Sequence, residues 1–320
     1  MISIVIPNYN GKKYLQDCLE SIKAQTYTDY EIIIIDNAST DDNYSWLLQQ
    51  DEILFKRLDQ NYGFSKAVNE GIQLSRGEYV LLLNNDTVLE PNFLKEIRQA
   101  IEVDHRIFAV SSKMISYQDR SIIDDAGDEY TLLGWTLKCG DGKPVEAYTK
   151  PREVFSACAG AALYRKSIFD EIGYFDEHFF AYMEDVDISY RARTYGYKNT
   201  YCPTAHVYHI GSATSGSRHN AFKVKLAARN NIYVPYKNMP WIQLMLNIPF
   251  LSMGYFIKWI YFTKKGLGKA YRQGFLEGLT GVWKIEKVPF QWKNSKYYLK
   301  IEGLLVLNLI KYVKEYIRSH

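Results

Sequence analysis

A run of four isoleucines, residues 32–35, constrains the fold more than any other feature of the sequence. A strand that is apolar at every position is buried on both of its faces. Such a strand requires a sheet that has helices packed above and below it. The run therefore predicts an α/β fold for this part of the chain.

The segments around this run alternate between two kinds of pattern. Short apolar stretches predict strands, and longer stretches with apolar residues at helical spacing predict helices. This order implies a mostly parallel sheet, in which ligands bind beyond the carboxyl ends of the strands. The predicted strands are residues 2–7, 31–36, 53–58 and 79–83, and the predicted helices are residues 14–25, 66–74 and 92–101.

The middle of the chain is less regular. Residues 111–156 are richer in Gly and Asp, which predicts loops or hairpins. A strand is expected again at residues 157–164. Helices are expected at residues 166–172, 185–195 and 219–231.

Charged side chains are divided unequally along the chain. Residues 1–210 hold 21 Lys and Arg against 32 Asp and Glu, whereas residues 211–320 hold 18 against 4. Either the C-terminal third faces an anionic surface, or the two parts attract one another. No nucleic-acid-binding motif accompanies this charge, and its mixture with aromatic residues suits lipid headgroups better. We therefore expect a membrane surface as a partner, and no nucleic acid.

Residues 241–262 form a strongly apolar stretch with one charge, Lys258. By length, this stretch could just span a bilayer. However, Pro249 and Gly254 interrupt it, and aromatic residues gather at its end beside Lys264. A helical pair lying in the membrane interface fits at least as well. A buried core helix or an oligomer contact is the third interpretation.

The four cysteines, Cys18, Cys139, Cys158 and Cys202, are far apart and show no paired spacing. This spacing predicts neither a zinc site nor a disulfide framework, and it favours a reducing compartment. The first ten residues lack a basic region and a cleavage site, so we expect a cytoplasmic protein.

Polar residues follow three of the predicted strands. Their clusters are Pro7-Asn8-Tyr9-Asn10, Asp36-Asn37-Ala38-Ser39-Thr40-Asp41 and Asn84-Asn85-Asp86. Any one cluster could be only a turn or a helix cap. Three clusters at one sheet edge instead indicate a ligand site, because a nucleotide would lie at that edge.

The motifs then resemble a known family. The strings SIVIPNYNGKKYLQDCLESIKAQTYTDYEIIIIDNASTDD, NYGFSKAVNEGI and YVLLLNNDTVLEPNFL are similar to family 2 glycosyltransferases, which have the GT-A fold, a Rossmann-like mostly parallel sheet flanked by helices. The strings FSACAGAALYRKSIFDEIGYFDEHFFAYMEDVDISYRARTYGY and VYHIGSATSG resemble the bacterial rhamnosyltransferase-like branch. The resemblance covers about residues 1–235. It implies a catalytic domain with a nucleotide-sugar half at about residues 1–110 and an acceptor half at about residues 111–235, followed by a basic, aromatic, helical extension at residues 236–320.

The resemblance implies a donor site for a nucleotide-diphosphate sugar. Asp36 would accept a hydrogen bond from the imide N–H of uracil or thymine. Gly63 would let the backbone pass close to the nucleotide, and Asn84 would bond the ribose. The other implied donor-site residues are Pro7, Asn8, Tyr9, Asn37 and Asn85.

Asn84-Asn85-Asp86 occupies the place where the family usually has an Asp-x-Asp motif. Asp86 would hold Mn²⁺ or Mg²⁺, hard cations that prefer oxygen ligands and bridge phosphates. With one carboxylate in place of two, the site should depend on the donor's diphosphate. His209 matches the position of an additional metal ligand, with His206 as the competing candidate.

Asp185 lies where the family places its catalytic base, which would take the proton of the attacking acceptor hydroxyl. Direct displacement with one base implies inversion at the anomeric carbon. Glu184 and Asp187 would shape the acceptor pocket or cap the following helix. Arg218 and Arg229 are candidates for binding phosphate, or for the basic face.

The expected enzyme is thus an inverting hexosyltransferase of cell-surface polysaccharide synthesis, peripheral at the inner face of the cell membrane. Its donor would be dTDP- or UDP-linked, rhamnose or a related hexose, and its acceptor a saccharide or a lipid-linked saccharide. A nucleotidyltransferase of similar fold is one alternative, although PNYNGKKYL is a poor triphosphate loop. A non-catalytic protein that binds sugar nucleotides is another. An oligomer is possible.

Overall fold

The four-isoleucine run lies in β2 (Tyr30–Asp36) of a computed structural model that describes residues 1–41, 44–211 and 220–319. All four isoleucines are buried. β1 (Ile2–Asn8) runs parallel to β2, with Ile4 opposite Ile32. The predicted α/β class with a mostly parallel sheet is confirmed.

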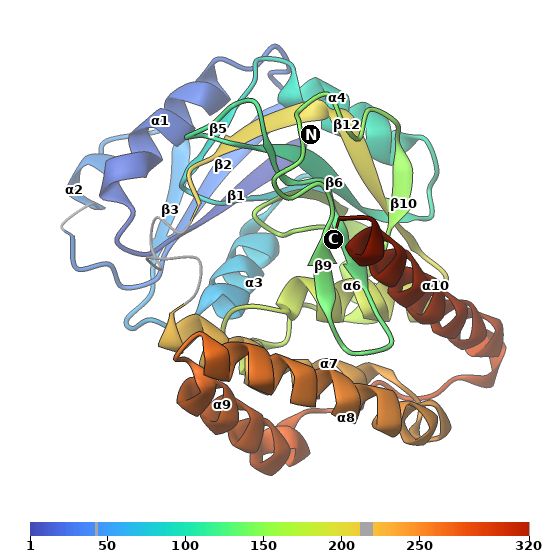
Figure 1. Cartoon of the computed structure of the whole chain (residues 1–320). Helices are drawn as coiled ribbons and strands as arrows, with labels where there is room; N and C mark the ends of the chain where they lie inside the picture. The colour runs from blue at the N-terminus through green and yellow to red at the C-terminus, as the bar shows by residue number, and fades with distance from the viewer. Residues whose placement is uncertain (42–43, 212–219, 320) are drawn as a thin grey trace.

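Ten strands form the main sheet within the described residues, and two more form a separate pair (Figure 1). The remaining strands are β3 (Ile53–Arg57), β4 (Tyr79–Leu83), β5 (Thr87–Leu89), β6 (Ile107–Ser116), β7 (Ile123–Asp125), β8 (Asp128–Tyr130), β9 (Thr136–Lys138), β10 (Arg152–Val154), β11 (Ala161–Arg165) and β12 (Lys198–His209). The order is β10-β12-β6-β11-β4-β1-β2-β3, with β5 paired to β12, β7 to β6, and β8 to β9. Strands β4, β1, β2 and β3 are parallel, whereas β11 is antiparallel to both β4 and β6.

Some of the helices cover the two faces of this sheet, and the C-terminal helices pack outside them. The helices are α1 (Lys12–Lys23), α2 (Tyr44–Leu47), α3 (Phe64–Leu74), α4 (Phe93–Glu102), α5 (Lys166–Ile172), α6 (Glu184–Thr194), α7 (Ala221–Asn238), α8 (Trp241–Lys264), α9 (Gly268–Gly281) and α10 (Ser295–Ser319), with 3₁₀ turns at Glu177–Phe179, Val282–Lys284 and Trp292–Asn294. In Figure 1, α7, α8 and α9 lie together below the sheet, and α10 lies beside β9 and α6.

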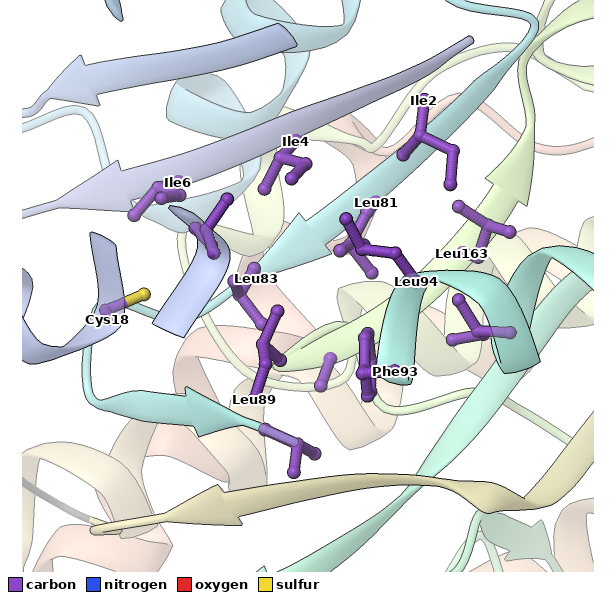
Figure 2. Packing of buried hydrophobic residues seen from close by; sticks show 14 of the residues in the cluster. Ile2, Ile4, Ile6, Cys18, Leu81, Leu83, Leu89, Phe93, Leu94 and Leu163 are labelled. Carbon is purple, nitrogen blue, oxygen red and sulfur yellow. The ribbon is translucent and has the colours of Figure 1, made fainter. Parts of the chain in front are cut away.

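The two faces of the sheet have separate apolar cores, because successive side chains of a strand point to opposite faces. Ile4 and Leu81 belong to the core beneath α1 and α4, which Figure 2 shows. Val5 and Leu82, the next residues along, belong to the opposite core beneath α3, α5 and α6. The central strands are therefore fixed from both sides.

The middle segment contains short strands and a hairpin, one of the two structures predicted for it. Residues 111–156 begin inside β6 and continue through the short strands β7 to β10. The predicted strand at residues 157–164 starts later, as β11, and the predicted helix at residues 219–231 extends to Asn238 as α7. Glycine and aspartate here turn the chain between strands instead of leaving it irregular.

The apolar stretch after residue 240 is one uninterrupted helix, α8, so the predicted break at Pro249 and Gly254 is wrong. Pro249 lies inside the helix, and Gly254 is buried against Leu133. Gly254 thus marks a close contact between α8 and the β8–β9 hairpin. Within the described residues, none of the helices combines the length and the apolar character that crossing a membrane requires.

The C-terminal helices share a core with the sheet domain. Leu305 of α10 is fully buried in the cluster that holds Tyr130 of β8 and Tyr190 of α6. The backbone carbonyl of Leu305 accepts a hydrogen bond from the Leu132 N–H at 3.2 Å. The amide of Asn308 donates to the Tyr130 carbonyl at 3.0 Å. Residues that the sequence places in an extension therefore complete the interior of the domain.

We predict that Leu305→Ala lowers the free energy of unfolding of the whole chain by about 2–5 kcal/mol, because it leaves a cavity in this shared core. Leu307→Ala, on the same helix but 53% exposed, should change it by less than about 0.5 kcal/mol. Urea unfolding followed by circular dichroism measures both. Equal effects of the two substitutions would show that α10 is not part of the core.

Candidate active site

A cavity of about 660 Å³ opens beyond the carboxyl ends of β1, β2 and β4. Its wall combines the N-terminal polar clusters with segments from the second half of the chain. The candidate residues that line it are Pro7, Asn8, Tyr9, Asn37, Gly63, Asn84, Asn85, Asp86, Glu184, Asp185 and His209. Segments that are far apart in the sequence thus meet around one space.

A chain of hydrogen bonds joins the ends of three neighbouring strands. Asn85, after β4, donates its amide to Asn8 of β1 at 2.7 Å. Asn8 in turn donates to the carboxylate of Asp36 on β2 at 2.8 Å. Asp36 also accepts bonds from the hydroxyl and the N–H of Ser39, at 2.5 and 3.0 Å. This chain fixes the floor of the cavity.

Asp36 itself does not line the cavity. The residue is 1% exposed, and its two oxygens accept the bonds from Asn8 and Ser39. Its neighbours Asn8 and Asn37 do line the cavity, although Asn8 is equally buried. The expected bond from Asp36 to the imide N–H of a base therefore stays a prediction.

Asn37 and Gly63 organise the next part of the wall. The Asn37 amide donates to Asn61 at 2.9 Å and to the Gly63 carbonyl at 3.0 Å. Gly63 has a φ of 86°, and a Cβ on it would lie 2.4 Å from the carbonyl oxygen of Phe180. The glycine therefore permits close approach of the Phe180 backbone. Gly63 also lines the cavity, so its predicted place beside a nucleotide stays a prediction.

Asp86 and His209 are brought together by strand pairing. Thr87 of β5 lies opposite His209 of β12. The His209 Nε2 atom consequently lies 3.5 Å from the Asp86 carboxylate. On its other side, His209 Nδ1 lies 2.7 Å from the carboxylate of Asp124, a residue that the sequence analysis missed. Burial lowers the pKa of His209, but these two carboxylates raise it more, to about 9.

The competing histidine, His206, has a different environment. Its Nδ1 atom is 3.2 Å from Glu90, and its Nε2 atom is 2.9 Å from the carbonyl of Pro203. Both ring nitrogens are therefore engaged, and the side chain does not line the cavity. This arrangement favours His209 as the histidine of the site.

The pair Asp86 and His209 fits a divalent cation. Two ligand atoms 3.5 Å apart can belong to one coordination shell, since bonds of about 2.1 Å at near-octahedral angles separate neighbouring ligands by roughly 3 Å. The Asp124 carboxylate contacts Nδ1, the ring nitrogen that is not near Asp86. It therefore fixes the orientation of the imidazole, as outer-shell partners of metal-bound histidines do. Among the described residues, no three His, Cys, Asp or Glu side chains gather as a complete metal cluster. Remaining ligands would come from a bound diphosphate and water.

The segment before α6 has an unusual backbone. Phe180, Tyr182 and Met183 all have positive φ angles, between 62° and 71°. Bulky residues adopt this conformation only when their surroundings impose it, and such strain concentrates at functional sites. The segment leads directly into Glu184 and Asp185, so its shape determines where these carboxylates point.

Helix α7 imposes this shape. Asn230 is fully buried, and its amide donates to the carbonyls of Phe179, Ala181 and Tyr182 at 3.0, 2.9 and 2.7 Å. Arg229 donates to the carbonyls of His178 and Phe179. Its guanidinium therefore holds the chain rather than facing the cavity, which corrects its proposed contact with phosphate.

Glu184 and Asp185 both face the cavity from the first turn of α6. Asp185 accepts a bond from the Val186 N–H at 2.8 Å. Burial raises the pKa of Asp185 above its usual value, although backbone N–H groups oppose this. Burial and then Asp185 raise the pKa of Glu184 well above its usual value. One Glu184 oxygen has no hydrogen-bond partner among the described residues. A raised pKa makes a carboxylate a stronger base.

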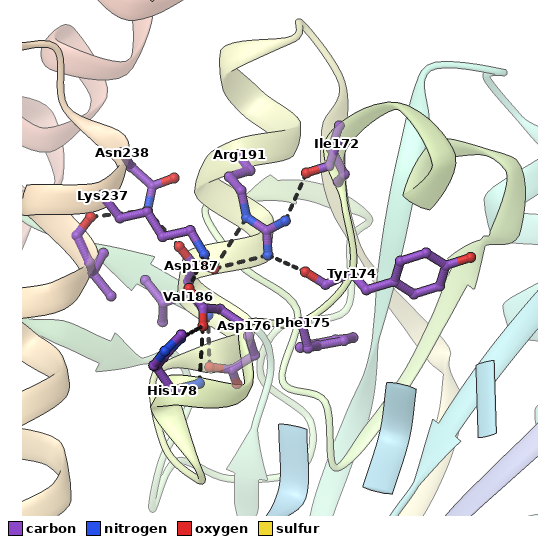
Figure 3. Close-up of polar contacts among 12 residues, drawn as sticks. Ile172, Tyr174, Phe175, Asp176, His178, Val186, Asp187, Arg191, Lys237 and Asn238 are labelled. Carbon is purple, nitrogen blue, oxygen red and sulfur yellow. Dashed lines mark hydrogen bonds and ion pairs between the residues drawn. The ribbon is translucent and has the colours of Figure 1, made fainter. Parts of the chain in front are cut away.

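Asp187 lies on the opposite side of α6, in the buried ionic network of Figure 3. Its carboxylate is 2.9 Å from Arg191 and 3.3 Å from Lys237, and it accepts a bond from Asn238 at 2.7 Å. The residue is fully buried and does not line the cavity. Asp187 therefore anchors α6 to α7, which corrects its expected place in the acceptor pocket.

Two lysines that the sequence did not indicate as site residues also line the cavity. Lys138, at the end of β9, is 3.0 Å from Asp124. Lys223 lines the cavity from α7; burial lowers its pKa, and the nearby charge of Asp86 opposes this shift. Neither residue belongs to a motif, because only the folded chain brings them to this wall. Arg218 lies outside the described residues.

A family model described as Glycosyl transferase family 2 matches residues 3–173 of this chain. The chain is 32% identical over 106 residues to glycosyltransferase GlyG of Streptococcus pneumoniae serotype 4, covering 32% of this chain and 35% of GlyG. It is 28% identical over 250 residues to the uncharacterized glycosyltransferase YwdF of Bacillus subtilis, covering 74% of this chain and 87% of YwdF. The chain spans 25% to 58% of the length of four curated relatives that it matches, GlyG included.

Solved structures show the same fold. GalNAc-T7, solved with UDP, GalNAc and Mn²⁺, has a TM-score of 0.62 and 17% identity over 89% of this chain and 56% of that chain. The mannosyltransferase PcManGT from Pyrobaculum calidifontis, in complex with GDP-Man and Mn²⁺, has a TM-score of 0.55 and 13% identity over 87% and 86% of the two chains. At these identities the likeness supports the GT-A-type architecture and nothing finer.

We predict that Gly11→Ala disrupts the floor of the cavity. A Cβ on Gly11 would lie 1.9 Å from the Asn85 amide nitrogen and 2.5 Å from the Asn8 side-chain oxygen, so the bond between them must break. The free energy of unfolding should fall by about 1–3 kcal/mol, as for other overpacked sites.

Gly303→Ala is the matched control, because nothing lies within 4 Å of the added Cβ. It should raise stability by up to about 1 kcal/mol through helix propensity. Thermal unfolding of both variants tests the pair. A Gly11→Ala variant as stable as the original chain would exclude the bond from a structural role.

Proposed function

The chain belongs to glycosyl transferase family 2, and from this premise we propose that it transfers a sugar from a nucleotide-diphosphate donor to an acceptor hydroxyl. One observation carries the proposal: Asp86, His209 and Asp185 come from distant segments and line the same cavity. A cation-binding pair and a basic carboxylate are the two groups that direct glycosyl transfer requires.

Asp86 and His209 would hold Mn²⁺ or Mg²⁺. When bound, the cation supplies Lewis-acid stabilisation of the negative charge that develops on the leaving nucleotide diphosphate. Lys223 lines the same wall, so its ammonium group would add to this stabilisation. Asp124 keeps the His209 ring oriented through its 2.7 Å contact.

Asp185 would act as the base. The acceptor hydroxyl loses its proton as its oxygen attacks the anomeric carbon, and a carboxylate with a raised pKa accepts that proton more readily. A single displacement of this kind inverts the configuration at the anomeric carbon. The partnerless oxygen of Glu184 would accept a hydrogen bond from another hydroxyl of the bound sugars.

The donor would lie along the N-terminal wall. Pro7, Asn8 and Tyr9 would form the base and ribose pocket, and they line the cavity together with Asn84, Asn85 and Asp86. Asp36 would act through Asn8, whose amide it fixes. We propose a UDP- or dTDP-linked hexose, and retain rhamnose as the first candidate because the motifs resemble rhamnosyltransferases.

The acceptor would be a saccharide or lipid-linked saccharide of cell-surface polysaccharide synthesis. We place the reaction in the cytoplasm. In support of this compartment, all four cysteines lie in described segments and are free thiols, as a reducing environment favours.

We predict that Asp185→Asn lowers kcat about 10²–10⁴-fold, the usual contribution of a positioned base. The amide keeps the shape of the side chain but cannot take a proton, so the affinity for donor nucleotide should change little. Single-turnover transfer assays and calorimetric nucleotide binding measure the two quantities. Glu184→Gln is the matched comparison, and a larger loss of kcat in that variant would assign the base to Glu184.

We predict that Asp124→Asn weakens Mn²⁺ binding in the presence of UDP about 10–100-fold, because a neutral amide supports the imidazole less well. Electron paramagnetic resonance of free Mn²⁺ measures this without turnover. Asp119→Asn is the control, since the carboxylate of Asp119 lies in an exposed turn and accepts bonds from the N–H and the hydroxyl of Ser121. Unchanged affinity in Asp124→Asn would exclude Asp124 from orienting a metal ligand.

A further inference from the structure

Helix α8 exposes an apolar surface along its whole length. Its buried residues are only Asn247, Leu251 and Gly254. We call the exposed large apolar side chains of this helix the α8 face; they are Trp241, Ile242, Met245, Leu246, Ile248, Phe250, Met253, Phe256, Ile257, Trp259, Ile260 and Tyr261. Soluble surfaces rarely carry so many contiguous apolar side chains unless something binds there.

The inner side of α8 is firmly attached to the domain. The Tyr255 hydroxyl donates to the Asn231 carbonyl of α7 at 3.0 Å. The Trp135 indole N–H, from the loop between β8 and β9, donates to the Gly254 carbonyl at 3.1 Å. The α8 face therefore belongs to a fixed helix, and it is not left exposed by a loose segment.

Both ends of the α8 face pair an aromatic ring with a lysine. At the start of the helix, the Lys287 ammonium lies 4.7 Å from the centre of the Trp241 ring. At its other end, Lys265 lies 4.7 Å from the centre of the Tyr261 ring. Twenty residues of helix separate these rings, which is about 30 Å. Aromatic rings beside cationic groups are typical of the boundary between lipid tails and headgroups.

The face extends beyond the helix at its first end. Trp283 is 79% exposed, and both Trp283 and Trp241 contact the ring of Tyr236, with ring centres 6.4 and 5.8 Å away. Trp283 thus adds a third aromatic side chain near Lys287. Exposed tryptophans grouped in this way are typical of a boundary between an apolar phase and water, where the ring contacts the apolar side and the indole N–H contacts the polar side.

The charged residues of α8 and the first part of α9 are all cations, whereas Glu302 of α10 contacts Gln243 and Asn247 on the side of α8 that packs against the domain. Residues 241–276 contain no Asp or Glu, but they contain five cations, Lys258, Lys264, Lys265, Lys269 and Arg272. A second copy of this chain would bring like charges together at such a surface, which disfavours a self-association. An anionic lipid layer offers both the complementary charge and an apolar interior.

We propose that the α8 face binds to the surface of an anionic bilayer, with the axis of α8 in the plane of the membrane. The aromatic–lysine pairs at both ends then lie at headgroup level, and the apolar side chains between them enter the outer edge of the lipid tails. This arrangement makes the chain a peripheral protein of a membrane's inner face.

Membrane binding would also position the candidate active site. The β8–β9 hairpin contacts α8 through Trp135, and its last residue, Lys138, lines the cavity. A bound lipid surface would therefore hold the cavity at a set distance from acceptors embedded in that surface. Binding itself needs no donor or metal, so the inference is independent of the proposed transfer activity.

The test is cosedimentation of the full chain with phosphatidylcholine vesicles that contain either none or about a third of phosphatidylglycerol. We expect binding to the anionic vesicles, a loss of more than tenfold in affinity on neutral vesicles, and strong weakening at high salt because surface charge is screened. Tryptophan fluorescence should shift to shorter wavelength on binding, as Trp241, Trp259 and Trp283 leave water.

Leu246→Glu with Met253→Glu is the test variant, because both side chains are exposed, 69% and 48%. It should lose vesicle binding more than tenfold while unfolding at an unchanged temperature. Val103→Glu, at an apolar residue that is 81% exposed far from α8, is the matched control and should bind like the original chain. Lys264→Glu with Lys265→Glu should weaken binding to anionic vesicles only.

Three results would overturn the proposal. The chain could fail to bind anionic vesicles, or Leu246→Glu with Met253→Glu could bind as well as the original chain. Analytical ultracentrifugation could also show a stable dimer that these two substitutions dissociate, which would assign the α8 face to a second copy. The salt and lipid dependence of the unaltered chain decides the question even if the variants fold poorly.

Discussion

The hydrogen-bonded chain from Asn85 through Asn8 to Asp36 is the interaction on which the site depends. It joins the carboxyl ends of β4, β1 and β2, which are neighbours in the sheet. Apolar side chains pack against both faces of each strand. The polar side chains at the end of a strand therefore contact one another or face the cavity. Asp36 contributes by fixing Asn8 rather than by facing the cavity. The donor side is consequently rigid before any ligand binds, a condition that favours precise binding.

The opposite wall of the cavity is stabilised in a different way, by buried polar side chains that bind a strained backbone segment. The segment from Phe180 to Met183 has a backbone conformation that its side chains disfavour, and Asn230 of α7 maintains it through three carbonyl groups. Lys237 and Asn238 of α7 bind Asp187 of α6 (Figure 3). Arg191 ties α6 to the carbonyls of Ile172 and Tyr174. Strain is thus stored beside Glu184 and Asp185 and is compensated by buried polar contacts. These contacts fix the position of the helix that carries Glu184 and Asp185.

The C-terminal helices link these walls to the outer surface. Leu305 fills the core beside Tyr130 and Tyr190, while α8 touches the hairpin that ends at Lys138 in the cavity. A surface proposed for lipid and a cavity proposed for sugar transfer are therefore parts of one folded unit. Removing the C-terminal third would take away part of the common interior, so single exposed residues are the better probes of its role.

The sequence alone determined the class of fold and the residues at the strand ends. Periods of two and 3.6 residues and unbroken apolar runs are local properties, and each can be read without knowing the rest of the chain. Its motifs also singled out Asp86 and Asp185, which the structure brings to one cavity. Only the tertiary structure decided that Asp124 supports His209 and that Asn230 shapes the segment before α6. It also decided which side chains line the cavity. Lys138 and Lys223 do, whereas Asp36, Asp187 and Arg229 do not. These roles depend on which face of each element is turned inward and on contacts between residues as much as 85 positions apart, and packing of the whole chain sets both.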